Sequence, residues 1–119
     1  MQSAADILSN ARFYMTDKRL VLTTCGSHAE ARKIAHALVE RHLAACVNII
    51  PQVESVYRWK GEVETAAEWL LVIKTTASAF TSLRDALGEL HSYEVPECLE
   101  IAITGGSPAY LKWFDESMK

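Results

Sequence analysis

Two long strand-like runs in the middle of the chain constrain its fold more than any other feature. They cover residues 45–59 and 62–76 and are joined at Lys60-Gly61. Each run is longer than the usual strand of about 3–10 residues, and at ~3.3 Å per residue each could extend on the order of 45 Å. A domain of ~100 residues has a radius of gyration of only about 13 Å. A ribbon that long must curl, break or project, and a projecting edge invites pairing with another chain. We therefore interpret it as an oligomerisation element, and Pro51 favours a break.

The register of this predicted hairpin can be set in two ways. A two-residue loop at Lys60-Gly61 pairs Trp59 with Glu62 and mixes apolar and acidic residues on both faces. A three-residue loop pairs Trp59 with Val63 and gathers the apolar residues of both strands on one face. Because a sheet that buries one face needs a consistent apolar pattern, we favour the three-residue loop.

Length and composition indicate one soluble domain. The chain has 119 residues, half of them hydrophobic, and a formal net charge of −3. An acidic chain without a basic stripe is not expected to bind nucleic acid. No apolar run approaches the ~20 residues of a membrane helix, and the N-terminus lacks the positive start of a signal peptide. The cysteines, which form no CxxC pair, suit free thiols in a reducing cytoplasm; they are Cys25, Cys46 and Cys98.

The remaining elements are placed by periodicity and by capping residues. Strands are predicted over 19–25 and 97–104, and helices from His28, over 78–90 and from Pro108 onward. The order is β-α-β-β-α-β followed by a helix, which is the α+β, split-βαβ or ferredoxin-like arrangement.

This order gives one domain, with a segment before it that has no clear role. We expect a single ferredoxin-like domain over 18–119, preceded by an extension over 1–17 that is a short amphipathic helix or a frayed tail. RNA-binding RRM domains share the topology but stack bases on aromatic residues of their central strands, and the run 19–25 has no aromatic residue.

Few residues suggest chemistry on their own. The chain has no nucleophile elbow, Walker loop, HExxH or GxGxxG, so we predict no enzyme and no catalytic residue. The aromatic and basic residues Tyr57, Arg58 and Trp59, with Lys74 and Trp69 in the next run, could line an anion-binding cleft or anchor a subunit interface.

Two further residues could bind a metal ion. His91 lies in a polar loop, where its imidazole could bind copper, zinc or nickel or could only cap the preceding helix. Cys25 ends a strand just before a predicted helix N-terminus, a position that lowers a thiol pKa. It is either a soft metal ligand, a redox-sensitive thiol or a buried structural cysteine. His36 and His42 are predicted to be surface residues.

Five segments in order resemble the CutA divalent-ion tolerance family, and the similarity runs from about Leu20 to Trp113. They are Leu43-Ala-Ala-Cys-Val-Asn-Ile-Ile-Pro51, Ser55-Val-Tyr-Arg-Trp-Lys-Gly-Glu62, Ile73-Lys-Thr-Thr76, His91-Ser-Tyr-Glu-Val-Pro-Glu97 and Tyr110-Leu-Lys-Trp113. The resemblance implies a ferredoxin-like fold, a homotrimer built through the long strands, an architecture like the PII signalling proteins, and a link to copper and other divalent cations.

The resemblance also implies functional residues. Family copper binding is associated with a first-strand cysteine and two adjacent histidines, but this chain has Thr23 and Leu90 at the positions of the cysteine and of one histidine. Cys25 lies two residues further on the same strand face, so His91 and Cys25 are the predicted ligands of weakly bound Cu²⁺ or another divalent cation. The predicted inter-subunit cleft residues are Tyr57, Arg58, Trp59, Lys74, Tyr93, Glu97 and Trp113. The alternative function is a PII-like sensor that binds a small anionic ligand in these clefts.

Overall fold

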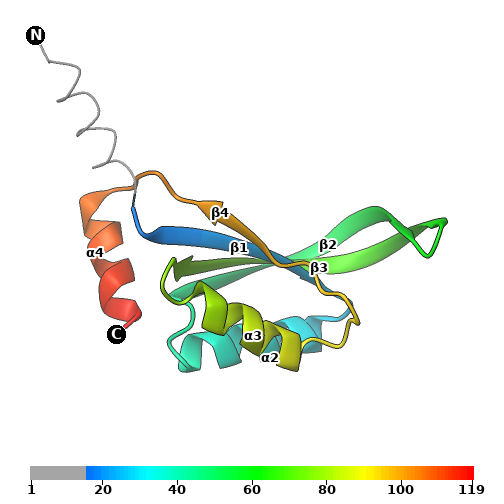
Figure 1. The fold of residues 1–119 in the computed structure, drawn as a ribbon, viewed down its shortest axis with the longest axis horizontal. Helices are drawn as coiled ribbons and strands as arrows, with labels where there is room; N and C mark the ends of the chain where they lie inside the picture. The colour runs from blue at the N-terminus through cyan, green and yellow to red at the C-terminus, as the bar shows by residue number, and fades with distance from the viewer. Residues whose placement is uncertain (1–15) are drawn as a thin grey trace, which may run out of the picture.

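The computed structural model describes residues 16–119 as one α+β domain. Its elements follow the predicted order (Figure 1): β1 (Lys18–Cys25), α2 (His28–Glu40), β2 (Cys46–Trp59), β3 (Glu62–Thr76), α3 (Phe80–Leu90), β4 (Leu99–Ala102) and α4 (Pro108–Ser117). The sheet is antiparallel with strand order β2-β3-β1-β4. The predicted ferredoxin-like fold is therefore confirmed. The helix or tail predicted near the N-terminus involves residues outside the described range.

The hairpin register differs from the one that the apolar pattern favoured. Trp59 pairs with Glu62, so the loop has two residues and the prediction of a three-residue loop is wrong. Lys60 and Gly61 have φ values of 51° and 84°, which suits the two-residue turns whose twist matches that of the flanking strands. Near the tip, Val63 is 64% exposed, so within the chain no core selects a register there.

The break predicted at Pro51 is present as an irregularity of β2. The register of β2 against β3 shifts between Ile50 and Val53, and Gln52 between them has a φ of 58°. A proline cannot donate to the ladder, so it is tolerated where pairing is interrupted. Beyond this bulge the hairpin projects past the helices (Figure 1), and residues 16–119 extend over 56 Å with a radius of gyration of 16.9 Å. Of the alternatives that its length left open, the ribbon therefore both breaks near Pro51 and projects.

Helices α2 and α3 cover one face of the sheet (Figure 1). Alternate strand residues, including Val21, Leu71 and Ile73, point into this layer and are fully buried. They pack against apolar residues of the helices at three- and four-residue spacing, which are Ala31, Ile34, Leu38, Leu83 and Leu87. No helix within residues 16–119 is both long enough and apolar enough to cross a membrane.

The opposite face of the sheet, called here the open face, is apolar but incompletely covered. Because Val21 points to the helices, its neighbours Leu20 and Leu22 point the other way, and so do their partners in β4, Ile101 and Leu99. Leu99 is 54% and Ile101 44% exposed. Ile50 of β2 adds to the same face and is 43% exposed. These five residues define the open face.

Helix α4 lies apart from α2 and α3, beside the start of β1 (Figure 1). Ser107 caps it by accepting a hydrogen bond from the Tyr110 N–H, with Pro108 in the first turn. Phe114 is buried, and the Lys18 Nζ lies 5.5 Å from its ring centroid. A residue of β1 thus fixes α4 to the sheet.

Candidate metal centre and adjoining groove

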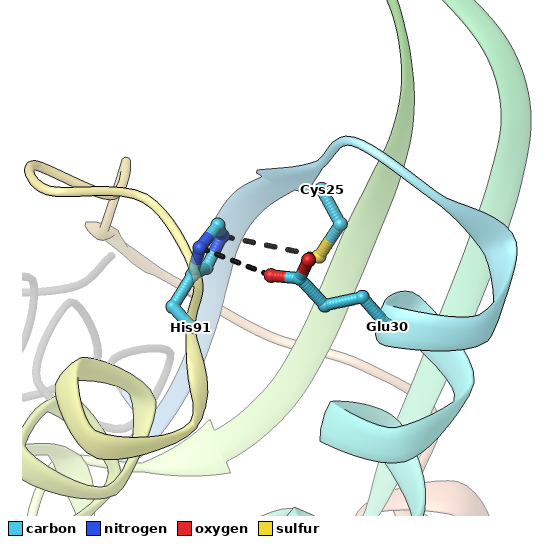
Figure 2. A group of neighbouring side chains, drawn as sticks. All are labelled: Cys25, Glu30 and His91. Carbon is cyan, nitrogen blue, oxygen red and sulfur yellow. Dashed lines mark hydrogen bonds and ion pairs between the residues drawn. The ribbon is translucent and has the colours of Figure 1, made fainter.

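The end of β1, the start of α2 and the end of α3 meet at one point, which Figure 2 shows. Cys25 is the last residue of β1. The Ser27 hydroxyl caps α2 by accepting a hydrogen bond from the Glu30 N–H at 3.2 Å, which places Glu30 in the first turn. His91 follows the last residue of α3 and donates its backbone N–H to the Leu87 carbonyl. Both helices pack on the same face of the sheet, so these termini converge.

The three side chains at this point, Cys25, Glu30 and His91, form a candidate metal site, called here the metal-ligand cluster. One potential ligand atom from each lies within 4.8 Å of the others. The His91 Nε2 is 3.9 Å from the Cys25 Sγ, and the His91 Nδ1 is 3.3 Å from a Glu30 carboxylate oxygen. A thiol, an imidazole and a carboxylate together are a donor set that suits a borderline transition metal.

Both ring nitrogens of His91 also contact the backbone. Nε2 lies 2.7 Å from the Thr24 carbonyl, which can only accept, so Nε2 carries the proton in a neutral ring. Nδ1 then accepts a hydrogen bond from the Tyr93 N–H at 3.1 Å. His91 is only 8% exposed, so these bonds hold a buried ring. The imidazole therefore has a structural role in the metal-free chain, and a metal ion would compete with one of these bonds.

Burial controls the charges of the cluster. It raises the pKa of the Cys25 thiol to about 12, with smaller contributions from Glu30 and Glu68. The thiol pKa is therefore raised, not lowered as the position before a helix predicted, because burial removes water from the thiolate. Burial alone would raise the Glu30 pKa, but hydrogen bonds from the Ser92 N–H and hydroxyl hold it below its usual value. The cluster is therefore a carboxylate beside a protonated thiol.

Glu30 is the cluster member that the sequence interpretation did not include. Its signal was present in the spacing Ser27-x-x-Glu30, the capping-box pattern. In the structure the carboxylate of Glu30 instead accepts two hydrogen bonds from Ser92, at 3.0 Å and 2.8 Å. Thr23, at the position of the family's cysteine, is fully buried, and its hydroxyl makes no hydrogen bond within the described residues.

A groove adjoins the cluster, between the hairpin and the loop that follows α3. Its volume is about 700 Å³. The residues lining it are Thr24, Ser55, Val56, Tyr57, Trp59, Glu64, Glu68, Tyr93, Glu94, Val95, Pro96 and Glu97. Four of the seven predicted cleft residues, Tyr57, Trp59, Tyr93 and Glu97, therefore come together here. Glu68, which the sequence interpretation missed, accepts a 2.6 Å hydrogen bond from the Tyr93 hydroxyl.

The other three predicted cleft residues lie away from the groove. Arg58 is at the hairpin tip, where its Nη1 donates to the Gly61 carbonyl at 3.3 Å. The Lys74 Nζ lies 5.7 Å from the Tyr110 ring centroid, and the Trp113 ring is 5.3 Å from that of Tyr110. Within the chain the predicted cations thus belong to the hairpin tip and to the α4 end of the sheet.

Comparison with known proteins extends the resemblance to the CutA family over most of the chain. The profile of the CutA1 divalent ion tolerance protein family matches residues 19–117. A divalent-cation tolerance protein CutA from Thermus thermophilus is 48% identical over 100 residues, covering 84% of this chain and 97% of that protein. A protein CutA homolog from Xenopus laevis is 49% identical over 90 residues, 76% of this chain and 60% of the relative. The crystal structure of CutA from Xylella fastidiosa has a TM-score of 0.85 at 36% identity, covering 87% of this chain and 100% of that chain. The chain therefore belongs to the CutA1 divalent ion tolerance protein family.

Proposed function

We propose that this protein is a non-enzymatic homotrimer of the divalent-cation response that binds Cu²⁺ or another divalent cation weakly. The observation that carries the proposal is the convergence of Cys25, Glu30 and His91 within 4.8 Å. Sulfur, nitrogen and oxygen donors together suit copper or zinc better than magnesium. Family membership supports a role in divalent-cation tolerance. The cysteines of the chain are free thiols, which supports a cytoplasmic location.

Weak binding follows from what a metal ion would displace. His91 would have to release either the Thr24 carbonyl or the Tyr93 N–H to provide a nitrogen lone pair. Cys25 would have to lose its thiol proton, although burial raises the pKa of this thiol to about 12. Because ligands must be deprotonated, we expect metal affinity to rise with pH.

The trimer is supported by surfaces that a single chain leaves uncovered. The open face presents exposed Ile50, Leu99 and Ile101. The edge strands β2 and β4 leave backbone groups unpaired within the described chain, and the hairpin projects far beyond the helices (Figure 1). Such edges and apolar patches typically pair with another chain.

The alternative, a PII-like sensor of a small anion, has less support from the geometry. Among residues 16–119, four glutamates and no lysine or arginine line the groove, so an anion would be repelled unless another subunit supplied cations. Arg58 and Lys74, which were expected to bind the anion, lie elsewhere in the chain. This alternative stays a prediction.

The metal site is tested by titrating Cu²⁺ into metal-free protein whose reductant has just been removed and whose mass is fixed by light scattering. We expect saturable heat at one site per chain, lost in His91→Ala and weakened in Glu30→Gln. His36→Ala is the matched control, because His36 is an exposed histidine of α2. Unchanged affinity in His91→Ala, or no saturable heat from a well-formed trimer, would contradict the proposal.

A further inference from the structure

We propose that the groove beside the hairpin binds a small organic cation, an alkylammonium or a guanidinium, with Glu68 as its counter-ion. This site is distinct from the metal-ligand cluster and shares no residue with it. The inference therefore does not depend on metal binding and can be tested on metal-free protein.

Glu68 is the residue that points to a ligand. It is only 6% exposed, yet it lines the groove. One carboxylate oxygen accepts a hydrogen bond from the Tyr93 hydroxyl, and the other accepts no hydrogen bond from residues 16–119. Within residues 16–119, no lysine, arginine or histidine nitrogen lies within 4.0 Å of the Glu68 carboxylate oxygens. This second oxygen reaches solvent, since within residues 16–119 the Thr23 hydroxyl is the only fully buried side-chain oxygen or nitrogen without a partner. A cation bound in the groove would pair with it there.

The walls of the groove fit an organic cation. Tyr57, Trp59 and Tyr93 are partly exposed there, at 40%, 36% and 38%. Aromatic faces attract ammonium and guanidinium groups. Glu64, Glu94 and Glu97 add negative charge to the same lining, and like charges that line a cleft concentrate the oppositely charged ligand there.

A bare metal ion fits the groove less well than an organic cation. Among the described residues, the metal-ligand cluster is the only group of three or more Cys, His, Asp or Glu residues that gathers ligand atoms within 4.8 Å. No three of the groove carboxylates therefore lie close enough together to share an ion. A volume of about 700 Å³ lies within the ~300–1,000 Å³ usual for small-molecule pockets. An alkylammonium ion fits better, because its ammonium group would pair with the Glu68 carboxylate while its alkyl part packs against the aromatic walls of the groove.

The test compares three four-carbon probes that differ in charge. The full-length protein is treated with EDTA, its mass is checked by light scattering, and n-butylammonium, n-butanol and n-butyrate are titrated in turn by calorimetry. We expect saturable binding of n-butylammonium alone. Glu68→Gln should lower its affinity by about tenfold or more, because a charge-assisted hydrogen bond is lost. Glu116→Gln, an exposed glutamate of α4 outside the groove, is the matched control and should bind like the parent.

A second variant keeps the test independent of the buried carboxylate. Trp59→Leu removes one aromatic wall at the hairpin and should weaken tetramethylammonium binding. Preferential binding of n-butyrate, or n-butylammonium binding that both variants leave unchanged, would overturn the proposal. Absence of binding by every probe would also overturn it. If Glu68→Gln but not Glu116→Gln then also lowered the oligomer mass, the counter-ion of Glu68 would instead be a lysine or arginine of a second copy.

Discussion

Cys25 ends β1 just before α2, where a helix N-terminus favours a thiolate, yet its side chain is fully buried in the core. The thiol pKa of about 12 means that it stays protonated under ordinary alkylation conditions. We predict that iodoacetamide at mildly alkaline pH modifies half-buried Cys46 at least ~10-fold faster than Cys25, because only thiolates react and Cys25 is inaccessible. Peptide mass spectrometry against time measures both rates. Equal labelling of the two cysteines in folded protein would contradict the buried, protonated assignment.

Lys18 shows the opposite balance between burial and pairing. Its ammonium is nearly buried and forms ion pairs with Asp17 and Asp115. Burial alone would lower the Lys18 pKa, but the hydrogen bonds to Asp115 and Asp17 raise it above its ordinary value. A lysine whose pKa is raised on folding stabilises the protein below the unfolded pKa of about 10.4, and that stabilisation is lost as pH rises through the folded pKa.

This sign gives a prediction for Asp115→Asn. The variant should lower the free energy of unfolding by about 1 kcal/mol near neutral pH, a modest value because the Asp115 side chain is 57% exposed. The deficit should shrink once Lys18 deprotonates in strong alkali. Urea unfolding at neutral and alkaline pH measures it, with Glu116→Gln as the control. A deficit that grows with pH would show that the ion pair is not its cause.

At the scale of elements, the hairpin turn depends on backbone geometry alone. Gly61 has a φ of 84°, and a Cβ added there would meet no atom within 4 Å. We predict that Gly61→Ala costs about 1 kcal/mol, because the left-handed conformation disfavours any side chain. Lys60→Asn should be neutral or slightly stabilising, since Asn-Gly is the preferred pair for this turn. Thermal unfolding of both variants tests this, and an unaffected Gly61→Ala would mean that the turn changes conformation.

The element order was predictable because it depends on local pattern, whereas the hairpin register was not. Periodicity located every described strand and helix, although β4 is shorter than the run 97–104 that alternation suggested. The register prediction assumed a buried face, but the hairpin tip is exposed in the chain. The Lys60-Gly61 turn therefore sets the register of the two strands. Turn geometry outweighed the apolar pattern.

The candidate sites were predictable only in part. His91, Cys25, Tyr57, Trp59 and Tyr93 are chemically distinctive residues, and the structure places each in the cluster or in the groove. Glu30 and Glu68 were missed because single glutamates on a helix and in a strand look like ordinary surface charges. Only the tertiary fold reveals that they are shielded and directed at those sites.

At the scale of the whole molecule, the two faces of the sheet differ in how they are covered. One face is closed by α2 and α3, and the ends of these elements build the metal-ligand cluster (Figures 1 and 2). The other face remains apolar and open, while α4 covers only the region near the start of β1. The loop after α3 connects both sites, because it contains His91 of the cluster and Tyr93 of the groove. Assembly through the open face would leave the cluster on the covered side of each subunit.

Assembly through the open face predicts the behaviour of Ile101→Asp. In an isolated chain this change should cost less than about 0.5 kcal/mol, because surface substitutions usually do, and Ile101 is 44% exposed. In a trimer it would bury an unpaired carboxylate, so we expect light scattering to report a mass below that of the parent, with a concentration-dependent melting temperature. Val39→Asp is the matched control, since Val39 is 41% exposed but lies on α2. If Ile101→Asp kept the parent mass while its circular dichroism stayed native, the subunits would have to associate through another surface.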